Sequence, residues 1–157
     1  MARRYRFSAV LVAMGGVLFS RPAGACSCAP IARDKMLPTV SDVFIGTVVG
    51  KLDTPPVPKA QNMPFSPLDT VTFELEVSET LKGEAKGRVG VTTGADSATC
   101  GFPFVVGHRY LVFARAGLGT LRTSLCFQNG EGPAIEREAT EVRRILAAKP
   151  TPVPKRR

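Results

Sequence analysis

Short stretches of alternating or β-branched apolar residues dominate the middle of the chain. Residues 71–77 alternate Val, Phe, Leu and Val with Thr, Glu and Glu, which indicates a strand with one buried and one wet face. The segments 42–49, 88–92, 109–114 and 120–126 are rich in β-branched and aromatic residues, as strands are. Five such strands joined by glycine-rich turns predict a small closed β-barrel.

Helical periodicity is confined to the two ends of this strand region. Residues 136–148 have charged residues on one face and an opposite apolar face formed by Ala139, Val142, Ile145 and Leu146. A helical turn is expected in residues 31–36. Residues 52–68 contain five prolines and predict a loop, and residues 149–157 predict a basic, Pro-rich, disordered tail.

The first 25 residues have the pattern of a secretion signal. Arginines at positions 3, 4 and 6 precede an uncharged apolar run over residues 9–19, and Ala23 and Ala25 supply a small-residue cleavage site. The run is shorter than the roughly 20 residues that span a bilayer, so no transmembrane segment is expected. We therefore predict a signal peptide over 1–25 and a secreted product, extracellular or periplasmic, with one domain over 26–148.

Two variants of export stay open. A lipid anchor at Cys26 is the minority interpretation, because Ala23-Gly24-Ala25 lacks the Leu that usually stands three residues before a lipidated cysteine. Twin-arginine export is also disfavoured, because the residues that follow Arg3-Arg4 fit its pattern poorly.

The basic net charge belongs to the ends of the chain. The total is +8, but the signal carries four of the 21 basic residues and none of the 13 acidic ones. The remaining surplus of +4 comes from Lys149, Lys155, Arg156 and Arg157, so residues 26–148 are balanced. A nucleic-acid partner is not expected, because a binder of nucleic acid needs a basic face on its folded body.

Four cysteines in an oxidising compartment predict two disulfides, for which sequence alone permits three pairings. Cys26 and Cys28 project from the same side of an extended segment and do not comfortably bond each other. Parallel ordering then gives Cys26–Cys100 and Cys28–Cys126, which attach the N-terminal segment to the barrel. A four-cysteine zinc site is less favoured, because zinc ligands usually come as two close Cys-x2-Cys pairs whereas Cys100 and Cys126 are isolated. A copper(I) site at Cys26 and Cys28 is also less favoured, because it would require reduced thiols.

Several motifs together resemble the tissue inhibitors of metalloproteinases and the related netrin-like modules. They are Cys26-Ser27-Cys28-Ala29-Pro30, Asp42-Val43-Phe44-Ile45-Gly46, Leu81-Lys82-Gly83, Cys100-Gly101-Phe102 and the segment 119–126. The resemblance implies a five-stranded OB-type barrel with a C-terminal helix, in a single-domain, bacterial-type member, and it supports the disulfide pairing above. A third barrel disulfide and a separate cysteine-rich C-terminal domain, both present in those inhibitors, are missing from this sequence.

The resemblance also implies a mechanism. Once Cys26 is the first residue, its α-amine and carbonyl oxygen would chelate the catalytic zinc of a bound metalloprotease, since zinc accepts such donors at its open position. Ser27 would enter the pocket beside the zinc, and Cys28, Ala29 and Pro30 would continue along the cleft. The adjoining ridge would consist of Ser97, Ala98, Thr99 and Cys100. No cofactor of the protein's own is implied.

One alternative function is open, and an enzymatic one is not expected. A netrin-like binding or envelope-associated module without inhibitory activity would use the same scaffold, since one fold hosts many functions. His108 is the only histidine and has no evident nucleophile or acid partner, so no catalytic residues are predicted. Four carboxylates are expected on a solvated face, at Asp69, Glu74, Glu76 and Glu79.

Overall fold

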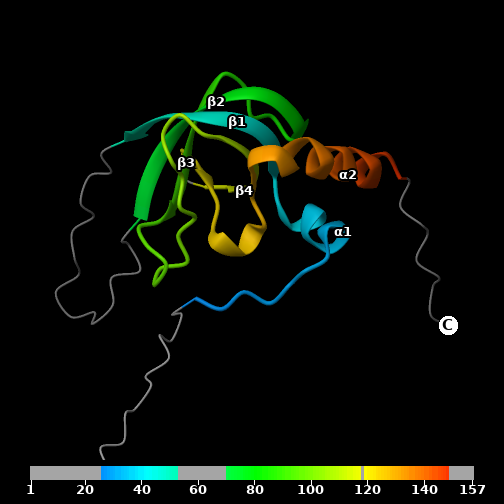
Figure 1. Cartoon of the computed structure of the whole chain (residues 1–157), viewed down its shortest axis with the longest axis horizontal. Helices are drawn as coiled ribbons and strands as arrows, with labels where there is room; N and C mark the ends of the chain where they lie inside the picture. Colours follow the sequence, from blue (N-terminus) through cyan, green and yellow to red (C-terminus); the bar gives the residue numbers. More distant parts are fainter. Residues whose placement is uncertain (1–25, 53–69, 118, 149–157) are drawn as a thin grey trace, which may run out of the picture.

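The computed structural model describes residues 26–52, 70–117 and 119–148 (Figure 1). Six strands are present: β1 (Asp42–Leu52), β2 (Thr70–Lys82), β3 (Arg88–Gly94), β4 (Arg109–Ala116), β5 (Leu121–Arg122) and β6 (Gly130–Glu131). The helical elements are α1 (Arg33–Met36), α2 (Ile135–Ala147) and the 3-10 turns η1 (Leu37–Thr39), η2 (Leu125–Phe127) and η3 (Gly132–Ala134). Within these ranges, none of the helices is long and apolar enough to cross a membrane.

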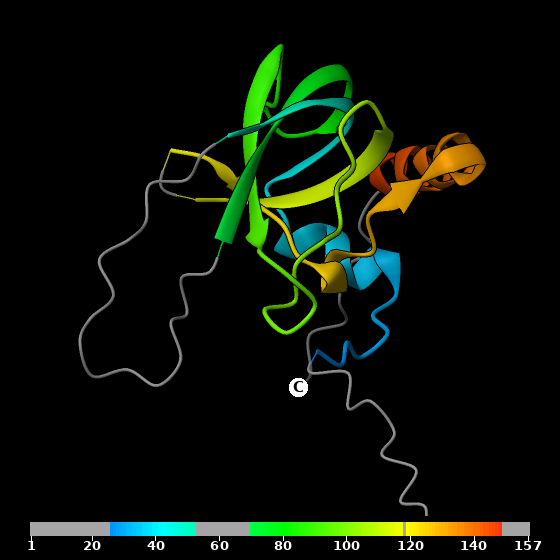
Figure 2. The same cartoon turned by 60° about the vertical axis from the view of Figure 1, so that its left-hand side comes forward.

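Five of the strands close into a barrel in the order β1-β2-β3-β5-β4, because β4 also pairs with β1 (Figure 2). All pairs are antiparallel except β3 and β5, which run parallel over two register pairs, Val91 with Leu121 and Thr92 with Arg122. The short β6 adds to the free side of β4. The expected mainly-β architecture, a closed five-stranded OB-type barrel with a C-terminal helix, is confirmed.

The core has two layers, which the alternation of β1 and β4 creates. Val43 and Ile45 of β1 face α1, η1 and α2, whereas Phe44 and Val48 of the same strand face the barrel interior. Both faces are therefore buried, which explains why this strand reads as an almost continuous apolar run instead of a clean alternation. Helix α2 covers one side of the barrel and contributes Ile135, Ala139 and Val142 to the outer layer.

The strand expected over 120–126 is correct only for Leu121 and Arg122. Further along, residue 124 would face Phe113 in the continued ladder, but side chains satisfy the Phe113 backbone instead. Its N–H donates to Asn129 Oδ1 at 2.8 Å, and its carbonyl accepts from Thr123 Oγ1 at 2.8 Å. The chain therefore leaves the sheet after Arg122 and forms the 3-10 turn η2.

Two further expectations need adjustment. Leu146 was expected on the apolar face of the helix but is 40% exposed, because α2 ends at Ala147 beyond the edge of the barrel. Thr72, expected on the wet face of its strand, is 7% exposed and hydrogen-bonds Thr92 at 2.9 Å. The expected signal over 1–25, most of the loop over 52–68, the carboxylate at Asp69 and the tail over 149–157 lie outside the described residues.

The turn after β2 is fastened to the start of β1 by a buried carboxylate. Asp42 Oδ1 accepts hydrogen bonds from the backbone N–H groups of Glu84, at 2.8 Å, and Ala85, at 3.1 Å. Gly83 adopts a positive φ of 85°, and a Cβ there would stand 2.2 Å from the same oxygen. Lys82 completes the junction, since its Nζ donates to the carbonyl of Leu37 at 2.6 Å.

Candidate functional site: the disulfide-anchored N-terminal edge

Residues 26–30, called here the N-terminal edge, precede α1 and belong to no helix or strand. Ser27, Ala29 and Pro30 are exposed, whereas the two cysteines are partly buried. Cys26 is bonded to Cys100 and Cys28 to Cys126, which are the pairs expected from the sequence. The cysteine sulfurs are therefore bonded to the barrel, whereas the side chain between them faces solvent.

The two disulfides lie against each other. The sulfur atoms of Cys26, Cys100 and Cys126 all lie within 4.8 Å of one another. Since all four cysteines are paired in disulfides, their sulfurs are not available as thiolate ligands. This arrangement corresponds to the structural use of the cysteines and not to a zinc or copper(I) site in the chain itself.

The ridge of residues 97–100 lies in the connection between β3 and β4 and is shaped by its own polar groups. Asp96 Oδ1 accepts from the Thr99 N–H at 3.0 Å, and the Asp96 N–H donates to Thr99 Oγ1 at 3.2 Å. Cys100 is held at a positive φ of 57°, and the carbonyl of Cys100 accepts from Leu125 N–H at 2.9 Å. These bonds fix the backbone from which the Cys100 sulfur reaches Cys26.

The backbone of Gly101, directly after the ridge, packs closely against the backbone of Gly94. Gly101 is buried, and a Cβ there would stand 2.1 Å from the carbonyl oxygen of Gly94. The Gly101 N–H donates to the Asp96 carbonyl at 2.7 Å, and the next N–H, of Phe102, donates to Thr93 Oγ1 at 2.8 Å. A glycine directly after the cysteine is therefore a packing requirement, which the Cys-Gly-aromatic motif did not by itself reveal.

The structure thus brings all the site residues expected from sequence to one end of the barrel. The edge contributes Cys26, Ser27, Cys28, Ala29 and Pro30, and the ridge contributes Ser97, Ala98, Thr99 and Cys100. Sequence reasoning missed Gln128, whose side-chain amide donates to the Ile31 carbonyl just beyond the edge. Its positive φ of 54° turns the chain there, but no local pattern in the sequence signals that contact.

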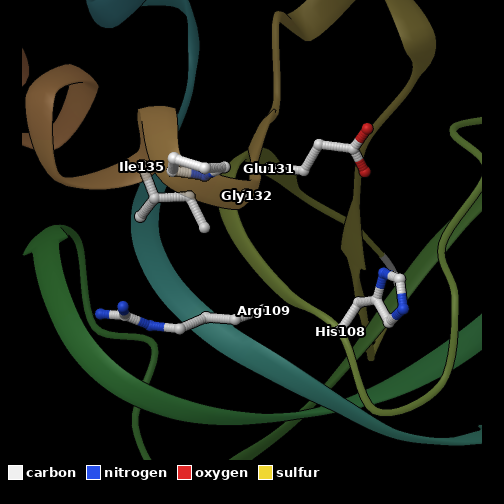
Figure 3. A pocket seen from close by; sticks show the side chains of 6 residues that line it. His108, Arg109, Glu131, Gly132 and Ile135 are labelled. Atoms are coloured by element: carbon white, nitrogen blue, oxygen red, sulfur yellow. The ribbon is translucent and has the colours of Figure 1, made fainter.

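A hollow lies elsewhere on the barrel, at the start of β4 (Figure 3). It has a volume of about 580 Å³, and His108, Arg109 and Glu131 are among the residues that line it. Arg109 pairs with Glu136 at 2.9 Å, and the imidazole of His108 stacks near the Tyr110 ring. No serine, threonine or cysteine is among the described residues that line this hollow, so none of them offers a hydroxyl or thiol nucleophile beside the histidine.

The carboxylates expected on a solvated face have surface roles where they are described. Glu74 and Glu76 both face Arg88, at 3.7 and 3.0 Å, and Glu79 pairs with Arg143 at 2.7 Å. These are ion pairs of partly exposed side chains, which contribute little to stability individually. They do not form a pair of carboxylates directed at a common substrate position.

A closed barrel of this topology, with its first segment held by two adjacent disulfides, defines a small disulfide-linked OB-type module. Within that class, the chain is similar to Metalloproteinase inhibitor 2 of Homo sapiens, with 27% identity over 128 residues. That match covers 80% of this chain and 56% of the human protein. The Metalloproteinase inhibitor 2 proteins of Rattus norvegicus and Canis lupus familiaris are also 27% identical, over 128 and 109 residues.

The extent of these matches is limited. The rat alignment covers 80% of this chain and 56% of the relative, and the dog alignment covers 68% and 48%. The chain therefore spans about half the length of the curated relatives that it matches. No family model matches the chain. The relatives are named as inhibitors and not as enzymes, and they support a module like those of the metalloproteinase inhibitors.

Proposed function

We propose that this protein is a secreted inhibitor of zinc metalloproteases that binds its target through the N-terminal edge. The observation that carries the proposal is the edge itself: Ser27, Ala29 and Pro30 are exposed, while Cys26 and Cys28 are each fastened to the barrel. The similarity to Metalloproteinase inhibitor 2 over 80% of the chain supports the same assignment.

In this proposal, the signal over 1–25 is removed and Cys26 becomes the first residue. Its α-amine and carbonyl oxygen then occupy the open coordination position of the target's zinc, which displaces the water that the protease needs for hydrolysis. Ser27 is the side chain that enters the adjacent pocket. Residues 97–100 provide a second contact, attached to the first through the Cys26–Cys100 disulfide.

Preorganisation makes the arrangement suitable for inhibition. A free peptide terminus loses conformational freedom when it binds, and that loss opposes affinity. Here two disulfides in mutual contact and the hydrogen-bonded ridge already restrict the segment. More of the favourable contact energy therefore remains as affinity.

The decisive experiment blocks the α-amine of Cys26, the group that is proposed to bind the zinc. The secreted protein is analysed by mass and N-terminal sequencing, and its inhibition of a panel of zinc metalloproteases is measured. A variant with one alanine inserted before Cys26 blocks the amine, and a variant with one alanine added after Arg157 is the matched control.

Inhibition by the wild type and the control, with loss in the N-terminally extended variant, is the expected result. Equal inhibition by all three proteins would exclude chelation by the amine. A mature chain that begins at another residue, or an acylated amine, would also exclude it. A free terminus that inhibits none of the proteases would instead favour a netrin-like binding or envelope-associated module.

A further inference from the structure

The C-terminal helix α2 shares an apolar core cluster with Met36 and Leu37, and it also makes ion pairs with one arginine on the N-terminal side of the molecule. Arg33, three residues after Pro30, is the first residue of α1. Its guanidinium lies 3.1 Å from Glu138 Oε2 and 2.9 Å from Glu141 Oε2, so it joins two successive turns of α2. Figure 1 shows α1 beside α2, with the segment that contains the edge leaving α1 beneath the barrel.

These Arg33 ion pairs are more enclosed than the other ion pairs of the surface. The side chain of Arg33 is 14% exposed and that of Glu138 is 19% exposed, and the guanidinium lies 6.0 Å from the centre of the Phe113 ring. Glu138 Oε2 is buried and has no hydrogen-bond partner among the described residues, and its charge is balanced by the Arg33 guanidinium 3.1 Å away. The carboxylate rests on Gly130, where a Cβ would stand only 2.1 Å from Oε2. The geometry around Arg33 is thus defined from several sides.

The helix does not need Arg33 for its own attachment. Its apolar residues pack into the outer core layer, and Arg143 makes three hydrogen bonds, of 2.7, 2.8 and 3.1 Å, to the Glu79 carboxylate of β2. The Arg33 ion pairs are instead the polar connection from the helix to the segment that follows the edge.

We infer that α2 is a positioning element for the N-terminal edge and that Arg33 is the positioning residue through which it acts. The disulfides fix the edge at Cys26 and Cys28, but they do not set the direction in which Ala29 and Pro30 leave. Arg33 contributes to that direction, because α1 cannot rotate or separate from the barrel without breaking both ion pairs. It acts together with the buried Met36 and Leu37 and with the hydrogen bond from Gln128 to the Ile31 carbonyl. For inhibition, this inference rests on the proposed function.

The test compares two charge-removing substitutions that each delete one attachment of α2. Arg33→Gln removes the connection to the edge segment, and Arg143→Gln, the control on α2, removes a more exposed arginine–carboxylate connection to β2. Amide hydrogen exchange at residues 27–32 and inhibition of a metalloprotease are measured on the full-length secreted chain. Circular dichroism spectra check that both variants keep the barrel.

We expect Arg33→Gln to accelerate exchange in residues 27–32 and to weaken inhibition roughly tenfold, a factor that corresponds to about 1.4 kcal/mol. The double variant Glu138→Gln and Glu141→Gln is expected to reproduce both effects from the helix side. Arg143→Gln is expected to leave both quantities at wild-type values.

The outcomes separate the inference from the proposed function. Unchanged exchange in Arg33→Gln, or equal changes in Arg33→Gln and Arg143→Gln, would overturn the positioning role whether or not the wild type inhibits. Faster exchange confined to residues 27–32 in Arg33→Gln would support it. If that change occurs and the wild type inhibits no protease, the proposed function fails while the positioning of the edge stands.

Discussion

Replacing Asp42 by alanine tests how much the barrel depends on the carboxylate that fastens the turn after β2 to β1. The side chain is 8% exposed and accepts hydrogen bonds from the N–H groups of Glu84 and Ala85. Alanine removes the acceptor and leaves both donors behind. The Ala85 N–H is buried, whereas that of Glu84 is only partly buried.

The magnitude follows from what each donor loses. A buried donor without a partner costs about 1–3 kcal/mol, and water that enters the space left by the carboxylate recovers part of the cost for the less buried donor. We therefore expect Asp42→Ala to lower the free energy of unfolding by about 2–4 kcal/mol. Asp42→Asn keeps an acceptor but loses its charge, so it should cost roughly half as much.

Urea unfolding monitored by circular dichroism measures these values, provided that the slope against urea concentration is unchanged. Asp34→Ala is the matched control, because the Asp34 side chain is 54% exposed and lies 3.8 Å from Lys35. We expect it to change stability by less than about 0.5 kcal/mol. If Asp42→Ala were as stable as this control, the two hydrogen bonds would have no net role and the reasoning would be refuted.

Three further predictions concern the ridge and the disulfides. Gly101→Ala should destabilise the barrel by about 1–3 kcal/mol, seen as a lower thermal midpoint, because its Cβ meets backbone and not a movable side chain; an unchanged midpoint would contradict the close approach to Gly94. Asp96→Ala should accelerate amide exchange at Thr99 roughly tenfold, since the exchanging N–H loses its acceptor, and equal exchange would mean that the carboxylate does not order the ridge. Replacing Cys28 and Cys126 together by serine should lower stability by about 4–5 kcal/mol in denaturant unfolding, because that disulfide spans 98 residues; a loss below about 1 kcal/mol would contradict this estimate.

Much of the fold was predictable because its strands carry strong local patterns. β4 is a nearly continuous apolar run and β2 alternates over seven residues, so the start of each was located within one residue. The observed strands continue beyond the expected ends, by two residues in β4 and by five in β2. The helix was placed one residue late, since η3 leads directly into α2. These elements depend mainly on side chains whose burial is visible in the sequence.

The remaining features depend on contacts between distant residues. β6 is two residues long and forms only because β4 presents a free edge to it, and β5 is shortened by side-chain hydrogen bonds to Phe113. The motif Asp42-Val43-Phe44-Ile45-Gly46 was noted only as part of the family resemblance. In the structure its carboxylate accepts a hydrogen bond from the turn at Gly83. This motif and Leu81-Lys82-Gly83 therefore contact each other in the structure. Only the pairing of β1 with β2 reveals that contact.

The disulfide pairing at the candidate site was predictable from the sequence, whereas the polar contacts that support the N-terminal segment were not. Cysteine count and order gave the pairing that the structure has, and through it the proximity of the edge to residues 97–100. The contributions of Gln128 and Arg33 could not be predicted, because each bridges more than 90 positions of the chain. Polar side chains of this kind look like ordinary surface residues in a sequence.

The parallel contact between β3 and β5 has only two register pairs, as few as the contact between β4 and β5 and fewer than the other junctions of the barrel. Cys100 follows β3 and Cys126 follows β5, so the N-terminal segment joins the two strands on either side of that junction. Opening the barrel there would pull Cys26 and Cys28 apart. By mass action, a partner that binds the intact edge must therefore also raise the free energy needed to open the barrel. Partner binding and barrel closure are thermodynamically coupled. A partner of the edge should therefore raise the thermal unfolding midpoint of the protein, and that increase would detect it.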